Sequence, residues 1–279
     1  MSTLIHIGTH KTASSYLQFY YFPTLTNINY FHGELALTNM VRNTCSSYEN
    51  TLLSNESFSG LAWNTLWKNG KQNDFHWIES FEKCLTNLYQ LFPKESLLIF
   101  FRRHGDFLIS MYKQYIQEGG ILKFDNFYSE TGVVRKADLS YLYRIKKACS
   151  LFNKVYILSY EDFKKNGNSF LDNFFLNELK FTRNNAAIDK IKANKSISGF
   201  KVELLRKINK TYNKFPLGFT NSLRLMRLSP RDILQNKLSF WSPEDTAYLQ
   251  KAKDRINAEF QDDWNFIEEI KWKHVIHKT

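Results

Sequence analysis

The chain has 279 residues, which is enough for one large domain or two small ones. Its formal net charge of +11 suits an anionic partner: nucleic acid, an acidic membrane surface or a phosphorylated small molecule. Its three cysteines, Cys45, Cys84 and Cys149, form no CxxC pair, which argues against a disulfide framework and a structural zinc site. Without a signal peptide or a long apolar run, we expect a cytoplasmic protein with peripheral membrane contact at most.

Short apolar runs in the first part of the chain predict buried strands at residues 4–7, 51–54, 97–101 and 155–159. Between them, apolar residues recur every three or four positions, most clearly over 75–92 and 139–152, which predicts helices. Strands that alternate with long helical connections favour parallel pairing through right-handed crossovers. The predicted fold is therefore α/β, a three-layer sandwich around a central, mainly parallel sheet.

The second part of the chain is basic and helical. Residues 179–214 carry many lysines and arginines against only Asp189 and Glu203, and we expect most of these cations to lie on a solvated helix face. Residues 242–260 predict a helix with Ser242 as its N-cap. With no repeat and no convincing linker, we expect a single domain, 1–279, whose residues 215–279 form a helical C-terminal extension.

The stretch "GTHKTASSY" follows the first predicted strand and leads into a helix expected from about Ser14. The start of a helix offers unpaired N–H groups and the positive end of the helix dipole, which suits an anion. Lys11 adds a point charge, and Thr12, Ser14 and Ser15 add hydroxyl donors. The nucleotide triphosphate loop, GxxxxGK[ST], does not fit this spacing, and no GxGxxG is present. The alternative is a simple turn with an incidental lysine.

A second motif, "RRHGDFLIS", follows the predicted strand 97–101. Arg102 is placed at the carboxyl end of that strand, and Asp106 and Ser110 lie on the helix that follows. Ligands of open α/β sheets bind at the carboxyl ends of the strands. A guanidinium and a hydroxyl there suit a phosphate monoester, which arginine can grip with two hydrogen bonds.

Together the two stretches resemble the sulfotransferases that use 3′-phosphoadenosine-5′-phosphosulfate, most closely bacterial, carbohydrate-type members. That family holds the 5′-phosphosulfate in a loop of the type P-K-[ST]-G-[ST]-[ST]-x-L. The matching residues are His10, Lys11, Thr12, Ala13, Ser14, Ser15, Tyr16 and Leu17. Ala13 stands where the family usually has glycine.

The resemblance extends to later motifs. The family binds the 3′-phosphate with an Arg-Asp-Ser spacing that Arg102, Asp106 and Ser110 match in full. It often has "YED[LF]" after a later strand, and residues 159–163, "SYEDF", fit. "NKSIS" at 194–198 is a weaker match, which implies that Lys195 and Ser196 close over the 3′-phosphate or the adenine. Tyr16 matches a position where members place an aromatic ring against the adenine.

The activity that the resemblance implies is in-line sulfuryl transfer to a hydroxyl or amine, without a metal. Lys11 would stabilise the charge that develops on the leaving group. Glu56 is our first choice for the base that accepts the acceptor's proton, with Glu34 and His32 as rivals. Aromatic residues crowd 60–77 and 112–128, regions expected to border the cleft. Rings beside polar groups there favour a carbohydrate or glycolipid acceptor, although such rings also suit a core or a lipid tail.

Two other functions are open at this stage. One is a P-loop-type kinase that uses ATP and Mg²⁺ on a small metabolite, which predicts a metal-holding Asp at a strand end. The other is a catalytically degenerate, nucleotide-binding protein. Nucleic-acid binding is not expected, because few aromatic residues interleave with the basic segment. The oligomeric state is left unassigned.

Overall fold

The structure of the protein is a computed structural model that describes residues 2–9, 11–33, 50–60, 76–184, 199–212, 214–215, 247–271 and 274–275. The described residues form a six-stranded sheet in the order β2-β3-β1-β4-β5-β6. All neighbouring strands are parallel except the last pair, β5 and β6. The strands are β1 (Ser2–Ile7), β2 (Asn29–His32), β3 (Asn50–Asn55), β4 (Ser96–Phe101), β5 (Lys154–Ser159) and β6 (His274–Val275).

Helices connect and cover these strands. In chain order they are α1 (Ser14–Tyr16), η1 (Leu17–Tyr21), η2 (Phe22–Thr24), η3 (Glu56–Ser59), α3 (Trp77–Leu91), α4 (His104–Gln117), α5 (Phe124–Phe127), η5 (Lys136–Leu139), α6 (Tyr141–Leu151), α7 (Tyr160–Asn166), α8 (Asn168–Asp172), η6 (Asn173–Glu178), α9 (Gly199–Tyr212), α12 (Ala247–Glu259) and α13 (Gln261–Ile270). The four predicted strands and the helices predicted over 75–92 and 139–152 are present, each within a few residues of its expected bounds. The helix predicted over 242–260 is present as α12, and its expected N-cap, Ser242, lies outside the described residues.

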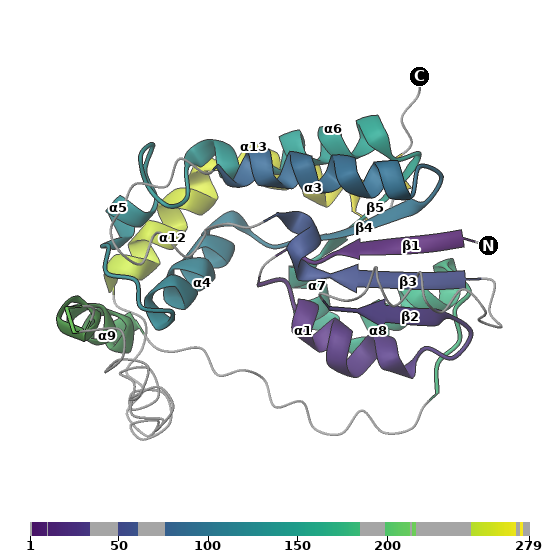
Figure 1. Ribbon diagram of the computed structural model, residues 1–279, viewed down its shortest axis with the longest axis horizontal. Coiled ribbons are helices and arrows are strands. Elements are labelled where there is room, and N and C mark those ends of the chain that lie inside the picture. The colour runs from purple at the N-terminus through teal and green to yellow at the C-terminus, as the bar shows by residue number, and fades with distance from the viewer. Residues whose placement is uncertain are drawn as a thin grey trace.

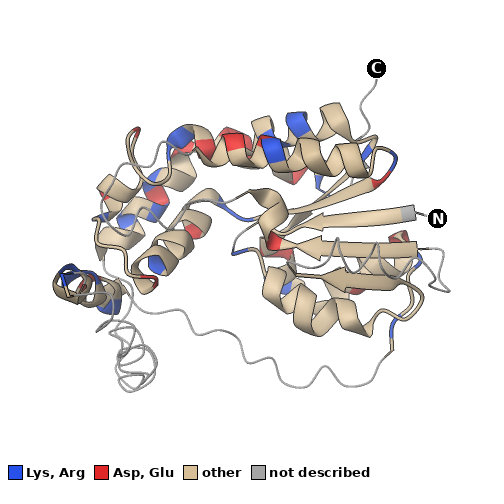
Figure 2. Ribbon diagram, viewed as in Figure 1, with Lys and Arg blue, Asp and Glu red and all other residues tan. Residues whose placement is uncertain are grey.

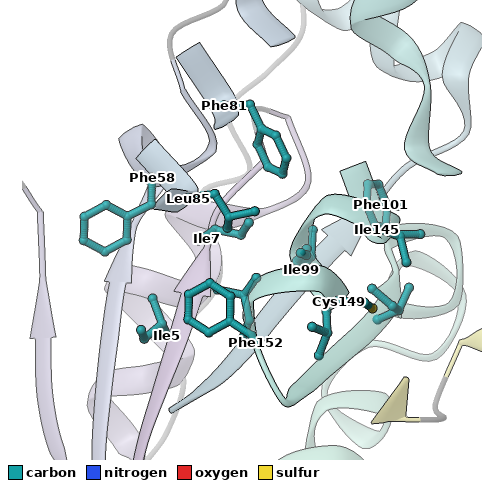
Figure 3. Close-up of a cluster of buried hydrophobic side chains, with 14 of the residues drawn as sticks. Ile5, Ile7, Phe58, Phe81, Leu85, Ile99, Phe101, Ile145, Cys149 and Phe152 are labelled. Carbon is teal, nitrogen blue, oxygen red and sulfur yellow. The ribbon is translucent and has the colours of Figure 1, made fainter. Parts of the chain in front are cut away.

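The sheet is buried on both faces, which confirms the predicted three-layer α/β sandwich (Figure 1). On one face Ile5 and Ile7 pack with Leu53 and Ile99 beneath α3, α6 and α13, as Figure 3 shows for part of this cluster. On the other face, residues of β1, β3, β4 and β5 pack against η1, η2, α8 and η6. Burial on both faces explains why these strands read as continuous apolar runs in the sequence.

A separate apolar cluster lies beyond the carboxyl ends of the strands, where α4, α5, α9 and α12 pack together. Helices α4 and α12 come close together at Gly105, in the first turn of α4. The N–H of Gly105 donates to Asn257 Oδ1 at 2.8 Å. A Cβ on Gly105 would lie only 2.3 Å from the backbone oxygen of Lys253. Glycine is therefore required for α12 to pack against the start of α4.

Replacing this glycine should loosen the α4–α12 packing. We expect Gly105→Ala to lower the free energy of unfolding by about 2 kcal/mol or more, because the clash is with backbone and outweighs the roughly 1 kcal/mol gain in helix propensity. Denaturant unfolding measures the change. Lys251→Ala, an exposed position on α12, is the control and should stay within about 0.5 kcal/mol of the wild type. Equal stability of both variants would contradict the packing account.

Helix α13 fixes the starts of α4 and α6 through one carboxylate. Asp263 accepts from the N–H groups of Tyr141 and Leu142 at 2.7 and 2.8 Å, and lies 3.0 Å from His104 Nε2. Burial lowers the pKa of His104, and its ring is stacked between Tyr141 and Phe260. Burial alone would raise the pKa of Asp263, but the bonds it accepts hold that pKa below its usual value. The carboxylate thus caps α6 and orients the His104 ring.

The basic helix α9 is only partly a solvated face. Figure 2 shows lysine and arginine gathered on α9, at one end of the molecule. Lys207 and Lys210 are exposed, as predicted. Lys201 and Arg206 are buried instead, and the Arg206 guanidinium pairs with Glu203 at 2.9 Å. Two of the four cations on α9 are therefore buried rather than solvated.

No helix in the described part of the chain is long and apolar enough to span a membrane.

Candidate functional site

The loop after β1 joins strand to helix as predicted. β1 ends at Ile7 and the helical segment begins at Ser14, running through α1, η1 and η2 to Thr24. Gly8 allows a close approach in between, because a Cβ there would lie 2.6 Å from Ser14 Oγ and 3.2 Å from Glu56 Cα. The loop, the start of the helix and Glu56 therefore meet at the carboxyl end of β1.

Internal hydrogen bonds shape this loop. Thr9 Oγ1 donates to the carbonyl of Phe100 in β4. Thr12 Oγ1 and Ser14 Oγ donate to the carbonyl of Thr9 at 2.6 and 3.2 Å. Two of the three hydroxyls predicted to contact an anion are thus buried and bonded within the loop, whereas Ser15 is exposed. The loop is built around Thr9, a role the sequence did not indicate.

Two loop residues adopt left-handed backbone angles. Lys11 has φ 63° and Ala13 has φ 68°, ψ 18°. This region is open to glycine and costs an alanine or lysine roughly 1–2 kcal/mol. The glycine that the resembled family carries at the position of Ala13 therefore has a conformational reason, and its absence leaves strain in the loop.

Restoring that glycine should relieve the strain. Ala13→Gly is expected to raise the free energy of unfolding by up to about 1 kcal/mol, because relief of the left-handed angle exceeds the extra entropy of glycine in the unfolded chain. The same substitution in the right-handed helix α12, Ala252→Gly, should lower it by about 1 kcal/mol or more. Denaturant unfolding of both variants provides the measurement. A loss at Ala13 equal to that at Ala252 would rule out the left-handed strain.

Arg102 lies beside this loop, at the carboxyl end of β4. Its Nη1 donates to the carbonyl of Lys11 at 3.1 Å, and its guanidinium lies 4.7 Å from the ring centre of Tyr160. Among the described residues, no acceptor pairs with its buried Nε. Ser110 lies two turns into α4 and is half-buried. The two predicted anion motifs therefore meet at adjacent strands.

The other residues of the second motif have partners. Asp106 Oδ1 lies 3.5 Å from Lys253 Nζ in α12. Arg103 donates from Nη2 to Gln261 at 3.1 Å, which directs its guanidinium to α13. The backbone N–H of Arg103 donates to Glu161 Oε1 at 2.9 Å, so that Glu161, from the "SYEDF" stretch, holds the start of α4. Burial raises the pKa of Glu161.

The structure separates the candidates for a base. Glu56 is half-buried and directly follows β3, the neighbour of β1, with its Cα close to Gly8. His32 ends β2, one strand further out, where it is exposed and its ring stacks on Tyr30. Glu34 lies outside the described residues. Of the two described candidates, Glu56 is the one that lies beside the loop.

His6 lies beneath the loop and is structural, as expected from its place in a strand. It is fully buried, its Nδ1 is 2.7 Å from Ser54 Oγ, and its ring packs edge-on against Phe22 and Phe100. Burial lowers the pKa of His6 to about 3, although the nearby Glu56 carboxylate acts in the opposite direction. The imidazole is therefore neutral throughout the physiological range.

A buried neutral histidine makes stability depend on pH. Below pH 6.5 the unfolded chain binds a proton that folded His6 does not bind until about pH 3, so stability falls as the pH drops through this window. We expect the wild type to lose about 1.4 kcal/mol per pH unit through His6. His6→Asn, which keeps a nitrogen near Ser54, should have a shallower slope by that amount. Urea unfolding between pH 7 and 4.5 tests this, and parallel slopes would contradict it.

The aromatic residues behave differently from expectation. Tyr16 is buried, stacked on Tyr20 and Phe163, and its hydroxyl donates to Asn168 Oδ1 at 2.5 Å. The predicted acceptor-binding rings that the structure describes also belong to the core: Trp77, Tyr112, Tyr115, Phe124 and Phe127. The buried guanidinium carbon of Arg144 lies 4.2 Å from the ring centre of Trp77 and 4.6 Å from that of Phe81. These five rings therefore take the core role that the sequence left as the alternative, and they do not border an acceptor site.

Several predicted site residues lie outside the described part of the chain: His10, Lys195 and Ser196, as well as Trp63 and Trp67. Within the described residues, no group of three or more His, Cys, Asp or Glu side chains could hold a metal ion. Sequence reasoning missed Tyr160 and Glu161 as neighbours of Arg102. The "SYEDF" match was the available signal, because β4 and β5 are adjacent strands whose carboxyl ends lie side by side.

No sequence profile of a known protein family matches the chain, and no curated protein matches it. Among solved structures, it is similar to the crystal structure of a sulfotransferase from Alicyclobacillus acidocaldarius, with a TM-score of 0.46 and 12% sequence identity. The match covers 79% of this chain and 99% of that chain. A likeness of this degree decides neither the family nor the function of the chain.

Proposed function

We propose that the protein is a sulfotransferase that uses 3′-phosphoadenosine-5′-phosphosulfate and moves its sulfuryl group to a hydroxyl or amine. The observation that supports this most is the contact between the two motifs. Arg102, from the stretch that resembles a 3′-phosphate site, donates to the carbonyl of Lys11, in the stretch that resembles a 5′-phosphosulfate loop. A nucleotide that carries phosphate at both positions needs both motifs at one place.

The residues present fit such a cosubstrate. Lys11 is half-exposed, Ser15 is exposed, and the helical segment that begins at Ser14 has Ala13 as its N-cap, without a side-chain cap. The Nε of Arg102 is buried with no acceptor among the described residues, as expected of a group that a phosphate would satisfy. Lys11, Ser15 and the first N–H groups of the helix would hold the 5′ end, and Arg102 with Ser110 the 3′-phosphate.

The chemistry divides between the cosubstrate and the chain. The bound cosubstrate supplies a sulfuryl group activated by its bond to a phosphate. Lys11 would place a positive charge where the leaving oxygen gains electron density. Glu56, across Gly8 from the loop, would accept the proton of the attacking hydroxyl or amine. In-line transfer requires the charge and the base on opposite sides of the moving group.

The acceptor class rests on the resemblance. Carbohydrate or glycolipid acceptors are typical of the members that the motifs resemble most closely. The rings that favoured a sugar from the sequence lie in the core where they are described, so they lend the acceptor class no support. A screen with sulfur-labelled cosubstrate against glycans, phenols and amines identifies it directly.

A thermal-shift panel tests the cosubstrate. Adenosine 3′,5′-bisphosphate without Mg²⁺, at about a hundred times its dissociation constant, should raise the melting temperature by roughly 5–10 °C. ATP with Mg²⁺ should have a much smaller effect. Stabilisation by ATP–Mg²⁺ without stabilisation by the bisphosphate would overturn the proposal in favour of a kinase. Stabilisation by the bisphosphate without label transfer in the screen would identify a degenerate nucleotide-binding protein.

A further inference from the structure

Arg102 has two kinds of contact that one role does not explain. A residue dedicated to a 3′-phosphate needs only its own strand and the ligand. Here the guanidinium also donates from Nη1 to the carbonyl of Lys11, 91 residues earlier in the chain. The carbonyl of Arg102 in turn accepts from the hydroxyl of Tyr141 at 2.7 Å, which fixes its backbone. The arginine is thus anchored at one end and holds the loop at the other.

The residue that Arg102 holds is one of the two in the loop with a left-handed backbone. Lys11 has φ 63°, an angle that a lysine does not adopt without support from its surroundings. A charged donor forms a stronger hydrogen bond to a peptide carbonyl than a neutral one. The bond from Arg102 is therefore placed to favour the backbone angle that aims the Lys11 side chain.

The guanidinium has capacity for a ligand as well. It carries five N–H groups in a planar fork. One of them reaches the Lys11 carbonyl, the plane stacks near Tyr160, and Nε has no acceptor among the described residues. The Glu161 carboxylate, which accepts from the backbone N–H of Arg103, interacts electrostatically with Arg102. A phosphate can therefore bind the fork while the bond to the loop is kept.

We propose that Arg102 is a positioning residue for the Lys11 loop, and that it couples recognition of the 3′-phosphate to the shape of the site for the 5′ end. This inference rests on the proposed function. A 3′-phosphate that immobilises the guanidinium also immobilises the carbonyl of Lys11. By linkage, a nucleotide that lacks the 3′-phosphate meets a less ordered loop and binds its 5′ end more weakly.

The test uses a ligand that cannot touch the 3′-phosphate site. Arg102→Met keeps the length and apolar packing of the side chain and removes its donors. We expect it to weaken binding of adenosine 5′-phosphate about fivefold to tenfold, because the Lys11 carbonyl loses its hydrogen bond from Arg102. Binding of adenosine 3′,5′-bisphosphate should weaken by about a hundredfold or more, because the bond to the loop and the contact with the 3′-phosphate are both lost. Titration calorimetry measures both affinities.

Two matched variants isolate the effect of the hydrogen bond from Arg102 to the Lys11 carbonyl. Arg103→Met removes the same charge from the next residue, whose guanidinium points to Gln261, and should leave adenosine 5′-phosphate binding within about twofold. Ser110→Ala should weaken only the bisphosphate. Hydrogen exchange gives a readout without ligand: amides of residues 9–13 should exchange faster in Arg102→Met than in either control.

The outcomes separate this inference from the proposed function. If Arg102→Met binds adenosine 5′-phosphate as the wild type does and its loop exchanges at the wild-type rate, the positioning role is wrong. An equal loss in Arg103→Met would assign the effect to charge alone and would also overturn it. If the wild type binds neither nucleotide, the proposed function fails, and the exchange comparison still decides whether Arg102 braces the loop.

Discussion

Lys11→Ala should abolish most sulfuryl transfer while leaving the nucleotide bound. Loss of a preorganised positive group at the leaving oxygen is expected to lower turnover about 100-fold to 1000-fold. The affinity for adenosine 3′,5′-bisphosphate should change by no more than about fivefold, because a half-exposed charge contributes little to ground-state binding. Transfer of labelled sulfuryl to the acceptor found in the screen, together with calorimetry, separates the two effects.

The substitution is well suited to this purpose. Alanine disfavours the left-handed backbone at this position about as much as lysine does, so the loop itself should not change shape. Lys207→Ala, at an exposed position on α9, is the matched control and should retain full turnover. Equal losses of binding and turnover in Lys11→Ala would show that Lys11 only anchors the nucleotide.

Glu56→Gln should have an effect of similar size through a different step. Glutamine keeps the shape of the side chain and cannot accept the acceptor's proton, so turnover should fall by about 100-fold to 10,000-fold. Bisphosphate binding and the free energy of unfolding should stay near the wild-type values. Single-turnover assays with labelled cosubstrate measure the chemical step directly.

His32→Asn is the companion variant, because His32 is the other described candidate for the base. It should retain most of the turnover, since its ring lies one strand away and stacks on Tyr30. Full activity in Glu56→Gln would exclude Glu56 as the base. A loss in His32→Asn at the same time would transfer the role to His32.

The central strands were predictable because their burial on both faces leaves a direct record in the sequence. β1, β3, β4 and β5 are apolar runs, and each appeared within two residues of its expected bounds. β2 left no such record. It is a four-residue edge strand in which only Asn29 is buried. Its short sequence, "NYFH", mixes polar and aromatic residues and forms a strand by pairing with β3, which a local pattern cannot reveal.

For the candidate site, the sequence could suggest residue types but not their contacts. Motif spacing indicated Lys11 and Arg102, yet the bond between them depends on β1 and β4 being neighbours in the sheet although β2 and β3 lie between them in the chain. The left-handed angle of Ala13 is likewise imposed by the fold, since alanine has no intrinsic preference for it. Aromatic residues misled for the opposite reason, because composition cannot distinguish a ring that binds ligand from one that fills a core.

The contacts of α12 and α13 with the start of α4 also bear on how the protein folds during synthesis. The amide of Gly105 bonds to Asn257, 152 residues later in the chain, and the ring of His104 bonds to Asp263, 159 residues later. Contacts of such long sequence separation form late and slow folding. During synthesis, the start of α4 therefore cannot make these contacts until α12 and α13 have been added to the chain.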